Sequence, residues 1–292
     1  MSAPEYVPVD GRPLRVAMGT RPLDLDDWIE IDGERPAELA EKDLLLEQQR
    51  AQVLATTDAG RAGAQETWEL LVDFLPRRFP QAYSREGDGL RDHQLDRVVA
   101  AGSDPLEAAA RLVQEDLAVM TSPEQGRWLL SAACLCFPSR WSLLDKIGRD
   151  MAQIHLPVPF YAERVGAPAD SFLDRLDPGR PVWRTNWTIL DGPELFQPAS
   201  PGAWRGVADG IDLGDALYFR VERQTLRRLP ASGAVLFTIR TYVRSLASLA
   251  SVRPGIYGDL ASTLRQTPAE TVDYKGWTPL MGPLLDWLSL RA

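Results

Sequence analysis

Two alternating segments joined by a short turn constrain the fold of this chain more than any other feature. Residues 216–223 and 235–243 each place apolar side chains at every second position, as strands do. Pro230-Ala231-Ser232-Gly233 lies between them and is composed of turn-forming residues. We therefore predict that the two segments pair as an antiparallel hairpin.

Two further segments have the patterns of strands. Residues 181–190 alternate so that Arg184 and Asn186 share one face and two tryptophans share the other. Residues 128–137 form a nearly continuous apolar run between a glycine and a proline, which is typical of a buried strand. The middle of the chain is thus predicted to be a sheet.

Helical patterns occupy both sides of these strands. Asp104, followed by Pro105 and Glu107, has the form of a capped helix start, and Ser122-Pro123 marks the end of that helix. Ser142 can cap the next helix, which stops before His155. In chain order, helices are predicted at residues 36–55, 68–79 (ending or kinking near Pro76), 105–120, 143–154, 256–265 and 280–290.

Helices first, strands in the middle and helices last indicate an α+β fold with an antiparallel sheet. Residues 1–20 are rich in proline and glycine and are predicted to be an irregular lead-in. No linker is long enough to force a boundary, so we predict a single domain over residues 21–292 with helical extensions at both ends.

Composition excludes some classes of function. The chain has 292 residues and a formal charge of −9, which disfavours binding to a phosphate backbone and therefore to nucleic acid. It has no apolar stretch of about 18 residues that would span a membrane. Residues 1–15 lack the apolar core of a signal peptide, so we expect a cytoplasmic protein.

The chain has only two histidines, which limits its metal chemistry. His93 and His155 are too few for most multi-histidine sites, and a two-histidine, one-carboxylate site would need both to converge. The sequence also lacks the nucleophile elbow G-x-S-x-G, the dinucleotide fingerprint G-x-G-x-x-G and a phosphate-binding loop. His93 lies among charged and polar neighbours, which predicts a solvated side chain.

His155 stands in a different setting. It follows a predicted amphipathic helix and precedes Leu156-Pro157-Val158-Pro159, where each proline restrains the residue before it. An imidazole on a stiff backbone among apolar neighbours suits a haem axial ligand. A buried structural histidine is the alternative.

Other polar residues are candidates for ligand binding. The planar fork of Arg184 suits the carboxylate of a bound cofactor, although it would equally suit one of the chain's 41 acidic residues. Arg220, Glu222 and Arg223 lie on or near one strand, where a solvated face is the alternative. Cys134 and Cys136 cannot supply the four ligands of an iron–sulfur cluster and are expected to be buried, free thiols.

Several motifs in a fixed order resemble one protein family. Two are specific: Phe137-Pro138-Ser139-Arg140-Trp141, and K-I-G-x(5)-I-H-x-P-V-P from Lys146 to Pro159. Weaker ones are Pro22-Leu23-Asp24, Trp28-Ile29-Glu30-Ile31-Asp32, Arg184-Thr185-Asn186-Trp187, Glu222-Arg223-Gln224-Thr225-Leu226 and Phe237-Thr238-Ile239-Arg240-Thr241-Tyr242. Over residues 20 to 275 the chain resembles the haem-dependent oxidative N-demethylase alpha-subunit-like family.

The resemblance implies a PAS-like antiparallel sheet core, enlarged to hold a b-type haem. It also implies oxidative removal of a methyl group from a small secondary amine such as dimethylamine, giving a primary amine and formaldehyde. Oxygen is consumed, and electrons come from partner subunits that carry flavin and an iron–sulfur centre. This chain has neither of those motifs, so those cofactors would belong to partners. A haem-based sensor or haem-binding protein without demethylase activity is the alternative.

The resemblance also assigns site residues. His155 is implied as the proximal iron ligand, because haem needs an axial ligand and only one other histidine exists. The implied contacts to the haem propionates are Lys146, Arg149, Arg184 and Arg223. The implied polar residues of the distal side, where the reaction takes place, are Tyr242, Glu222 and Asn186.

Overall fold

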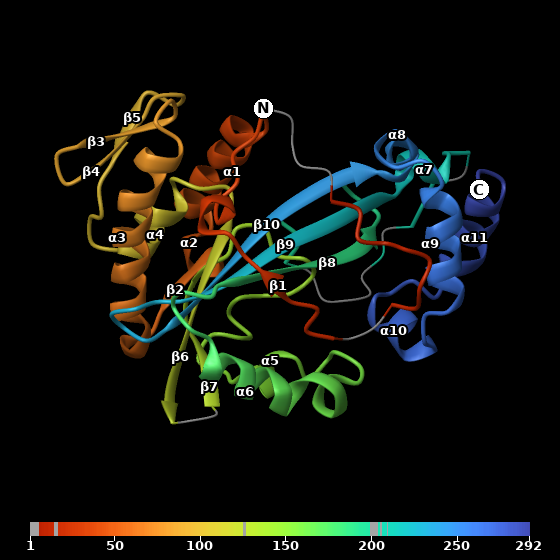
Figure 1. The fold of residues 1–292 in the computed structure, drawn as a ribbon. Coiled ribbons are helices and arrows are strands. Elements are labelled where there is room, and N and C mark those ends of the chain that lie inside the picture. The colour runs from red at the N-terminus through yellow and green to blue at the C-terminus, as the bar shows by residue number, and fades with distance from the viewer. Residues whose placement is uncertain (1–5, 15–16, 125–126, 199–203, 205, 209) are drawn as a thin grey trace.

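A seven-stranded antiparallel sheet runs through the centre of the computed structural model, which describes residues 6–14, 17–124, 127–198, 204, 206–208 and 210–292 (Figure 1). The strand order is β1-β8-β9-β10-β6-β7-β2. The strands are β1 (Arg21–Pro22), β2 (Leu54–Thr56), β6 (Asp116–Glu124), β7 (Arg127–Cys134), β8 (Val182–Leu190), β9 (Tyr218–Arg228) and β10 (Val235–Ser245). The fold is therefore α+β, as predicted.

The predicted hairpin is present, and its strands are longer than expected. Strands β9 and β10 pair from Tyr218↔Ser245 to Arg228↔Val235. The turn is held by helix α3, because the Glu66 carboxylate accepts hydrogen bonds from the backbone nitrogens of Ala231 and Ser232 at 2.8 and 2.7 Å. The strand predicted at residues 181–190 is present as β8, and it pairs with the other edge of β9.

Helices near the N-terminus cover one face of the sheet. They are α1 (Arg35–Gln48), α2 (Arg50–Val53), α3 (Arg61–Arg78) and α4 (Pro105–Ala110), with the short helices η1 (Leu25–Asp27) and η2 (Asp58–Gly60). Helix α3 carries the predicted apolar stripe, which is buried, and Pro76 lies in its last turn. At Gly63 a Cβ would lie 2.5 Å from a Val119 methyl, so glycine permits α3 to approach β6 closely.

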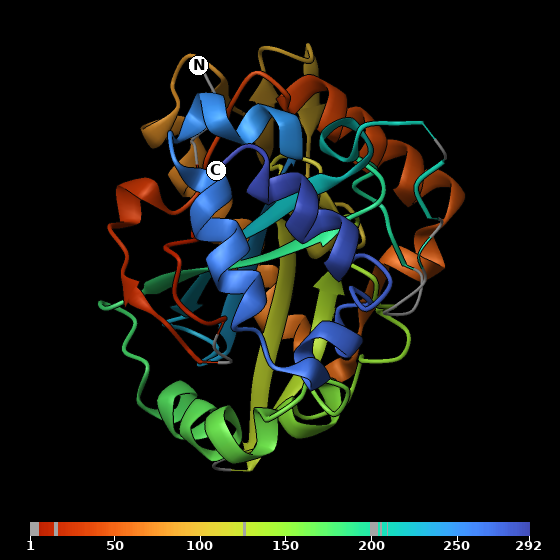
Figure 2. The same cartoon turned by 90° about the vertical axis from the view of Figure 1, so that its right-hand side faces the viewer.

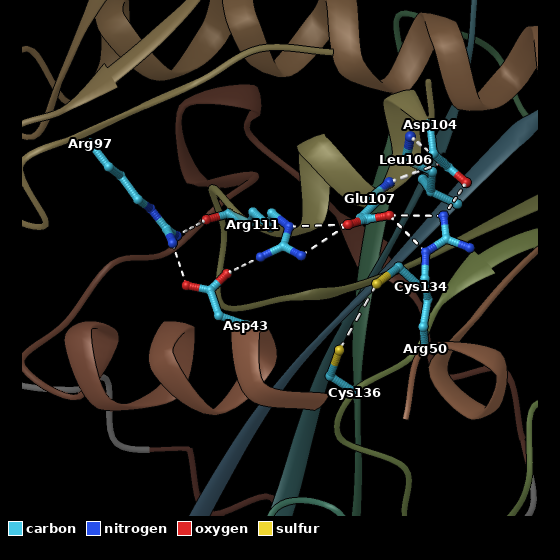
Figure 3. Close-up of polar contacts among 9 residues, drawn as sticks. All are labelled: Asp43, Arg50, Arg97, Asp104, Leu106, Glu107, Arg111, Cys134 and Cys136. Atoms are coloured by element: carbon cyan, nitrogen blue, oxygen red, sulfur yellow. Dashed lines mark hydrogen bonds and ion pairs between the residues drawn. The ribbon is translucent and has the colours of Figure 1, made fainter. Parts of the chain in front are cut away.

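A small second sheet packs beside α3. It consists of β3 (Tyr83–Glu86), β4 (Gly89–Asp92) and β5 (Arg97–Val99). Figure 3 shows an ion-pair network next to it, in which Asp43 of α1 binds Arg97 and also Arg111, the latter at 2.7 Å. Glu107 of α4 binds Arg111 at 2.9 Å and Arg50 at 2.8 Å. These pairs connect β5, α1 and α4, and their partial exposure makes each modest in free energy.

The same view shows the two cysteines at the end of β7 (Figure 3). Both are buried and free, which confirms the prediction. Their sulfur atoms lie 3.9 Å apart.

The C-terminal helices pack on the same sheet face, farther along the strands. They are α7 (Leu213–Ala216), η4 (Leu246–Ser248), α8 (Leu249–Val252), α9 (Ile256–Arg265), α10 (Ala269–Tyr274) and α11 (Met281–Ser289). Figure 2 shows these blue helices in front of the strands. Trp277 stacks on Trp187 of β8 at 5.7 Å and donates a hydrogen bond to the Ile189 carbonyl at 3.0 Å. The two predicted C-terminal helices are confirmed, whereas α10 was not predicted.

The opposite face of the sheet is covered by the segment from β7 to β8. It contains α5 (Met151–Ile154), the π-helical turn η3 (Ala162–Gly166) and α6 (Ala167–Arg175), drawn in green at the lower edge of Figures 1 and 2. Residues 6–14 and 17–20 contain no helix or strand, as expected for the lead-in; residues 1–5 and 15–16 lie outside the described residues.

Three predicted helices are shorter than expected. The helix capped by Asp104 ends at Ala110, because Asp116–Glu124, including Ser122-Pro123, is a strand held between β7 and β10. The predicted helix 143–154 forms only Met151–Ile154, because the backbone at 148–150 instead hydrogen-bonds to β7. The predicted helix 36–55 breaks at Gln49 and ends where Leu54 enters β2.

No helix in the described ranges is both long and apolar enough to cross a membrane.

Candidate functional site

A cavity of about 380 Å³ lies between the sheet and the segment from β7 to β8. This volume falls within the roughly 300–1,000 Å³ of typical small-molecule sites. Its apolar part is lined by the sheet residues Ala118, Met120, Leu130, Leu226, Val235, Phe237 and Ile239, and by Val165, Ala169, Phe172 and Leu173 of η3 and α6. Its polar part is lined mainly by Lys146, His155, Arg184, Asn186, Thr188, Glu222, Gln224, Tyr274 and Lys275.

Strand alternation explains this division. Arg184, Asn186 and Thr188 are every second residue of β8 and point into the cavity. Glu222 and Gln224 do the same on β9, and Asn186 pairs directly with Glu222 in the register. The lead-in also contributes, because Leu14, Ala17, Met18 and Thr20 line the cavity. No motif in residues 1–20 predicts that contribution.

His155 is fixed at the end of α5. The helix begins with a capping box in which the Asp150 carboxylate accepts from the Gln153 nitrogen at 2.9 Å. The His155 Nδ1 lies 2.8 Å from the Met151 carbonyl oxygen, and the ring stacks on Tyr161 with centroids 4.2 Å apart. A carbonyl only accepts hydrogen bonds, so Nδ1 carries the proton and Nε2 has a free lone pair.

The electrostatic surroundings keep this imidazole neutral. The pKa of His155 is lowered to about 4, mainly by burial, with a smaller lowering effect from the positive charges of Lys146 and Arg184 and a raising effect from the hydrogen bond to Met151. At neutral pH the ring is therefore uncharged. A neutral imidazole with a free Nε2 and a second nitrogen bound to a carbonyl is the arrangement found in metal-ligating histidines.

Two cations near His155 form no ion pair with any described residue. Lys146 lies in the turn after Trp141, with its Nζ 4.4 Å from the Trp141 ring centroid, and burial lowers its pKa to about 8. Burial also lowers the pKa of Arg184, and its buried Nε makes no hydrogen bond. Among the described residues, no carboxylate lies within 4.0 Å of either group. Unpaired cations facing a cavity form a site for an anion.

Glu222 is the only carboxylate among the described residues that line the cavity. Its Oε2 accepts hydrogen bonds from Gln224 Nε2 at 2.9 Å and Asn186 Nδ2 at 3.3 Å. Two side-chain amides thus hold the carboxylate in place, while its other oxygen, Oε1, makes no hydrogen bond to a described residue. The arrangement suits the binding of a cation.

The structure thus brings together five of the predicted site residues and separates three. Those in the cavity are His155, Lys146, Arg184, Asn186 and Glu222. Arg149 has an exposed side chain outside it.

Arg223 and Tyr242 lie on the opposite face of the sheet. Arg223 donates to the Trp28 carbonyl at 3.3 Å, and Tyr242 donates to Glu30 at 2.6 Å. The reason is alternation: Arg223 follows Glu222 directly, and Tyr242 has the parity opposite to that of the cavity residues Phe237 and Ile239.

Several cavity residues were missed by sequence reasoning. Lys275 and Tyr274 lie at the end of α10, and Tyr161 immediately precedes η3. They were missed because neither α10 nor η3 was predicted. One signal was available: the chain has only three lysines, and Lys146 and Lys275 both line the cavity. The third, Lys42, is buried under the sheet and donates to the Val113 carbonyl at 2.9 Å.

The other histidine is not part of this site. His93 is exposed in the turn after β4, as expected. Within the described ranges, no cluster of three or more histidine, cysteine or acidic side chains could hold a metal ion by itself. A lone histidine is sufficient only where the iron arrives with its own nitrogen ligands, as in haem.

The model of one known protein family matches residues 19–285, which is most of the chain. That family is described as haem-dependent oxidative N-demethylase, alpha subunit-like.

Proposed function

Because the chain belongs to the haem-dependent oxidative N-demethylase, alpha subunit-like family, we propose that it binds one haem b in this cavity and demethylates a small secondary amine. The products are a primary amine and formaldehyde, and dimethylamine is the simplest substrate of this class. The observation that carries the proposal is His155, whose Nδ1 is bound to a carbonyl while its Nε2 is left free at the cavity.

The residues present fit a haem. His155 would hold the iron through Nε2, and the apolar side chains of the sheet and of α6 would surround the haem ring. Lys146 and Arg184 would hold the propionates, because neither forms an ion pair with a described residue, and the Arg184 Nε is buried without a hydrogen bond. A charge-assisted hydrogen bond to a propionate would satisfy each of them.

The remaining polar residues act on the substrate. Haem supplies oxygen activation and electron transfer when bound. The carboxylate of Glu222 binds the ammonium group of the amine. Asn186 and Gln224 orient the Glu222 carboxylate through their hydrogen bonds. The apolar lining excludes water, which strengthens the attraction between carboxylate and ammonium.

We further propose that flavin and iron–sulfur partner subunits deliver the electrons. Cys134 and Cys136 are too few for a cluster and are buried. We also propose that residues 21–292 form a single domain built on an enlarged PAS-like sheet. The antiparallel order of the sheet and the cavity between it and the segment from β7 to β8 support that description.

Purified protein tests the proposal directly. We expect an absorbance band in the Soret region with one haem per chain, and formaldehyde release from dimethylamine when an electron donor and oxygen are supplied. A colourless protein that takes up no added hemin contradicts haem binding. Haem binding without formaldehyde from any secondary amine would instead support a haem-based sensor.

A further inference from the structure

The charges that line the cavity exceed what a haem needs. Four cationic side chains line it: Arg140, Lys146, Arg184 and Lys275. Arg140 is paired with Asp191, which lies outside the lining. Glu222 opposes the other three, so the remaining cavity charge matches the two negative charges of the haem propionates. If Lys146 and Arg184 hold the propionates, Lys275 and Glu222 remain without an ion-pair partner among the described residues.

Lys275 and Glu222 face the same cavity without touching. No ion pair within 4.0 Å joins them, although the charge of Glu222 acts on Lys275. Lys275 Nζ donates one hydrogen bond, to the Trp187 carbonyl at 3.0 Å, so that further N–H groups stay available. Glu222 accepts its two hydrogen bonds on Oε2, so that Oε1 stays available.

Both groups are held in place. Lys275 ends α10, its Nζ lies 5.2 Å from the Trp277 ring centroid, and the Trp187 carbonyl anchors it. A fixed ammonium and a fixed carboxylate that do not pair leave two charges in the cavity without an ion-pair partner, although each has neutral hydrogen-bond partners; such charges are costly to bury. A ligand with the complementary charges at its two ends would satisfy both at once.

We propose that Glu222 and Lys275 form a zwitterion-binding pair, and that the substrate is an N-methylated amino acid. Its secondary ammonium binds Glu222, and its carboxylate binds Lys275. The inference rests on the proposed function and narrows the amine to one that carries a carboxylate. Tyr274, which precedes Lys275 in the cavity lining, offers an aromatic face near the ammonium.

Calorimetric titration of the purified haem-containing protein tests the pair. The ligands are N-methylglycine, its methyl ester and dimethylamine at neutral pH. We expect N-methylglycine to bind about tenfold or more tightly than its ester, the factor for one charge-assisted hydrogen bond. Lys275→Gln should remove this difference and leave the affinity for dimethylamine within about twofold, since it loses no contact to that ligand. Glu222→Gln should weaken binding of all three.

Arg149→Gln is the matched control, because it also removes one positive charge, from an exposed side chain outside the cavity. It should leave all three affinities unchanged. Equal binding of ester and acid, or loss of haem from Lys275→Gln, overturns the inference. If the protein releases formaldehyde from dimethylamine but does not bind N-methylglycine selectively, the proposed function is supported and the zwitterion-binding pair is refuted. Absence of haem from the purified protein refutes the proposed function. The binding heats are measured without an electron donor, so that no turnover contributes to them.

Discussion

Acid should destabilise the haem-free protein through His155. The pKa of this ring is lowered to about 4 in the folded state, first by burial, whereas an unfolded histidine has a pKa near 6.5. Between these values the unfolded chain binds more protons than the folded one, so the free energy of unfolding falls as the pH falls. The contribution of His155 is fully present above about pH 6.5 and is lost progressively toward pH 4.

The magnitude follows from the two pKa values. Going from pH 7 to pH 5 should cost the folded state about 2 kcal/mol through His155 alone, and about 3 kcal/mol by pH 4. Other groups titrate in the same window with the opposite sign. Burial raises the pKa of Glu115 to about 7 and of Asp116 to about 6, so these carboxyls favour the folded state as the pH falls. The wild type alone therefore does not isolate the histidine.

Urea unfolding of the wild type and of His155→Ala at pH 7 and pH 5 isolates the contribution of His155 to the free energy of unfolding. The other groups cancel in the difference, so the variant should lose about 2 kcal/mol less than the wild type between these pH values. His93→Ala, which changes an exposed histidine, should behave like the wild type. If His155→Ala keeps the full acid sensitivity of the wild type, the ring is not a buried neutral imidazole, and its assignment as an iron ligand loses its electrostatic basis.

Three further outcomes are expected. Arg184→Ala should weaken haem retention by roughly tenfold or more, the value of one charge-assisted hydrogen bond, whereas Arg91→Ala on the small sheet should not; equal haem content in both variants is the refuting result. His155→Ala should lose haem or change the ligation of its iron, and His93→Ala should not; an unchanged Soret band in His155→Ala would show that His155 is not the iron ligand. Gly63→Ala should lower the free energy of unfolding by about 1–3 kcal/mol, measured by urea titration, because its Cβ has no room.

Local patterns were sufficient for the central strands. The hairpin of β9 and β10 was predictable because both alternation and turn residues are local signals. The alternation of β8 also placed Arg184 and Asn186 on one face, and both line the cavity. Helix α9 was predicted with its observed bounds, Ile256–Arg265, because its apolar face repeats with helical spacing.

Non-local pairing decided the regions where sequence reasoning was wrong. Asp116–Glu124 reads as the end of a helix, yet it becomes a strand because β7 and β10 offer hydrogen-bonding partners on both sides. Those partners are distant in sequence, and local propensity does not include them. Lys275 was missed for the same reason, since the contact that brings α10 to β8 joins residues far apart in the chain.

The choice between the two faces of the sheet could have been made more sharply. Glu222 and Arg223 are adjacent in a strand, so they point to opposite faces and cannot both line one cavity. The alternation of the strand predicts that Glu222 and Arg223 lie on opposite faces, but it does not predict which face binds the ligand.

The pairing of charges identifies the ligand-binding face, and it is visible only in three dimensions. On the face covered by the N-terminal helices, Arg240 contacts Asp32 and Glu38 at 2.7 Å each, so its charge is already satisfied within the protein. On the other face, Lys146 and Arg184 face a cavity with no carboxylate within 4.0 Å among the described residues. Burial of charge occurs on both faces, and at Lys146 and Arg184 it leaves a charge that faces a cavity and has no ion-pair partner among the described residues. A ligand of opposite charge would complete such charges, which is why we propose both the propionate site and the substrate site on this face.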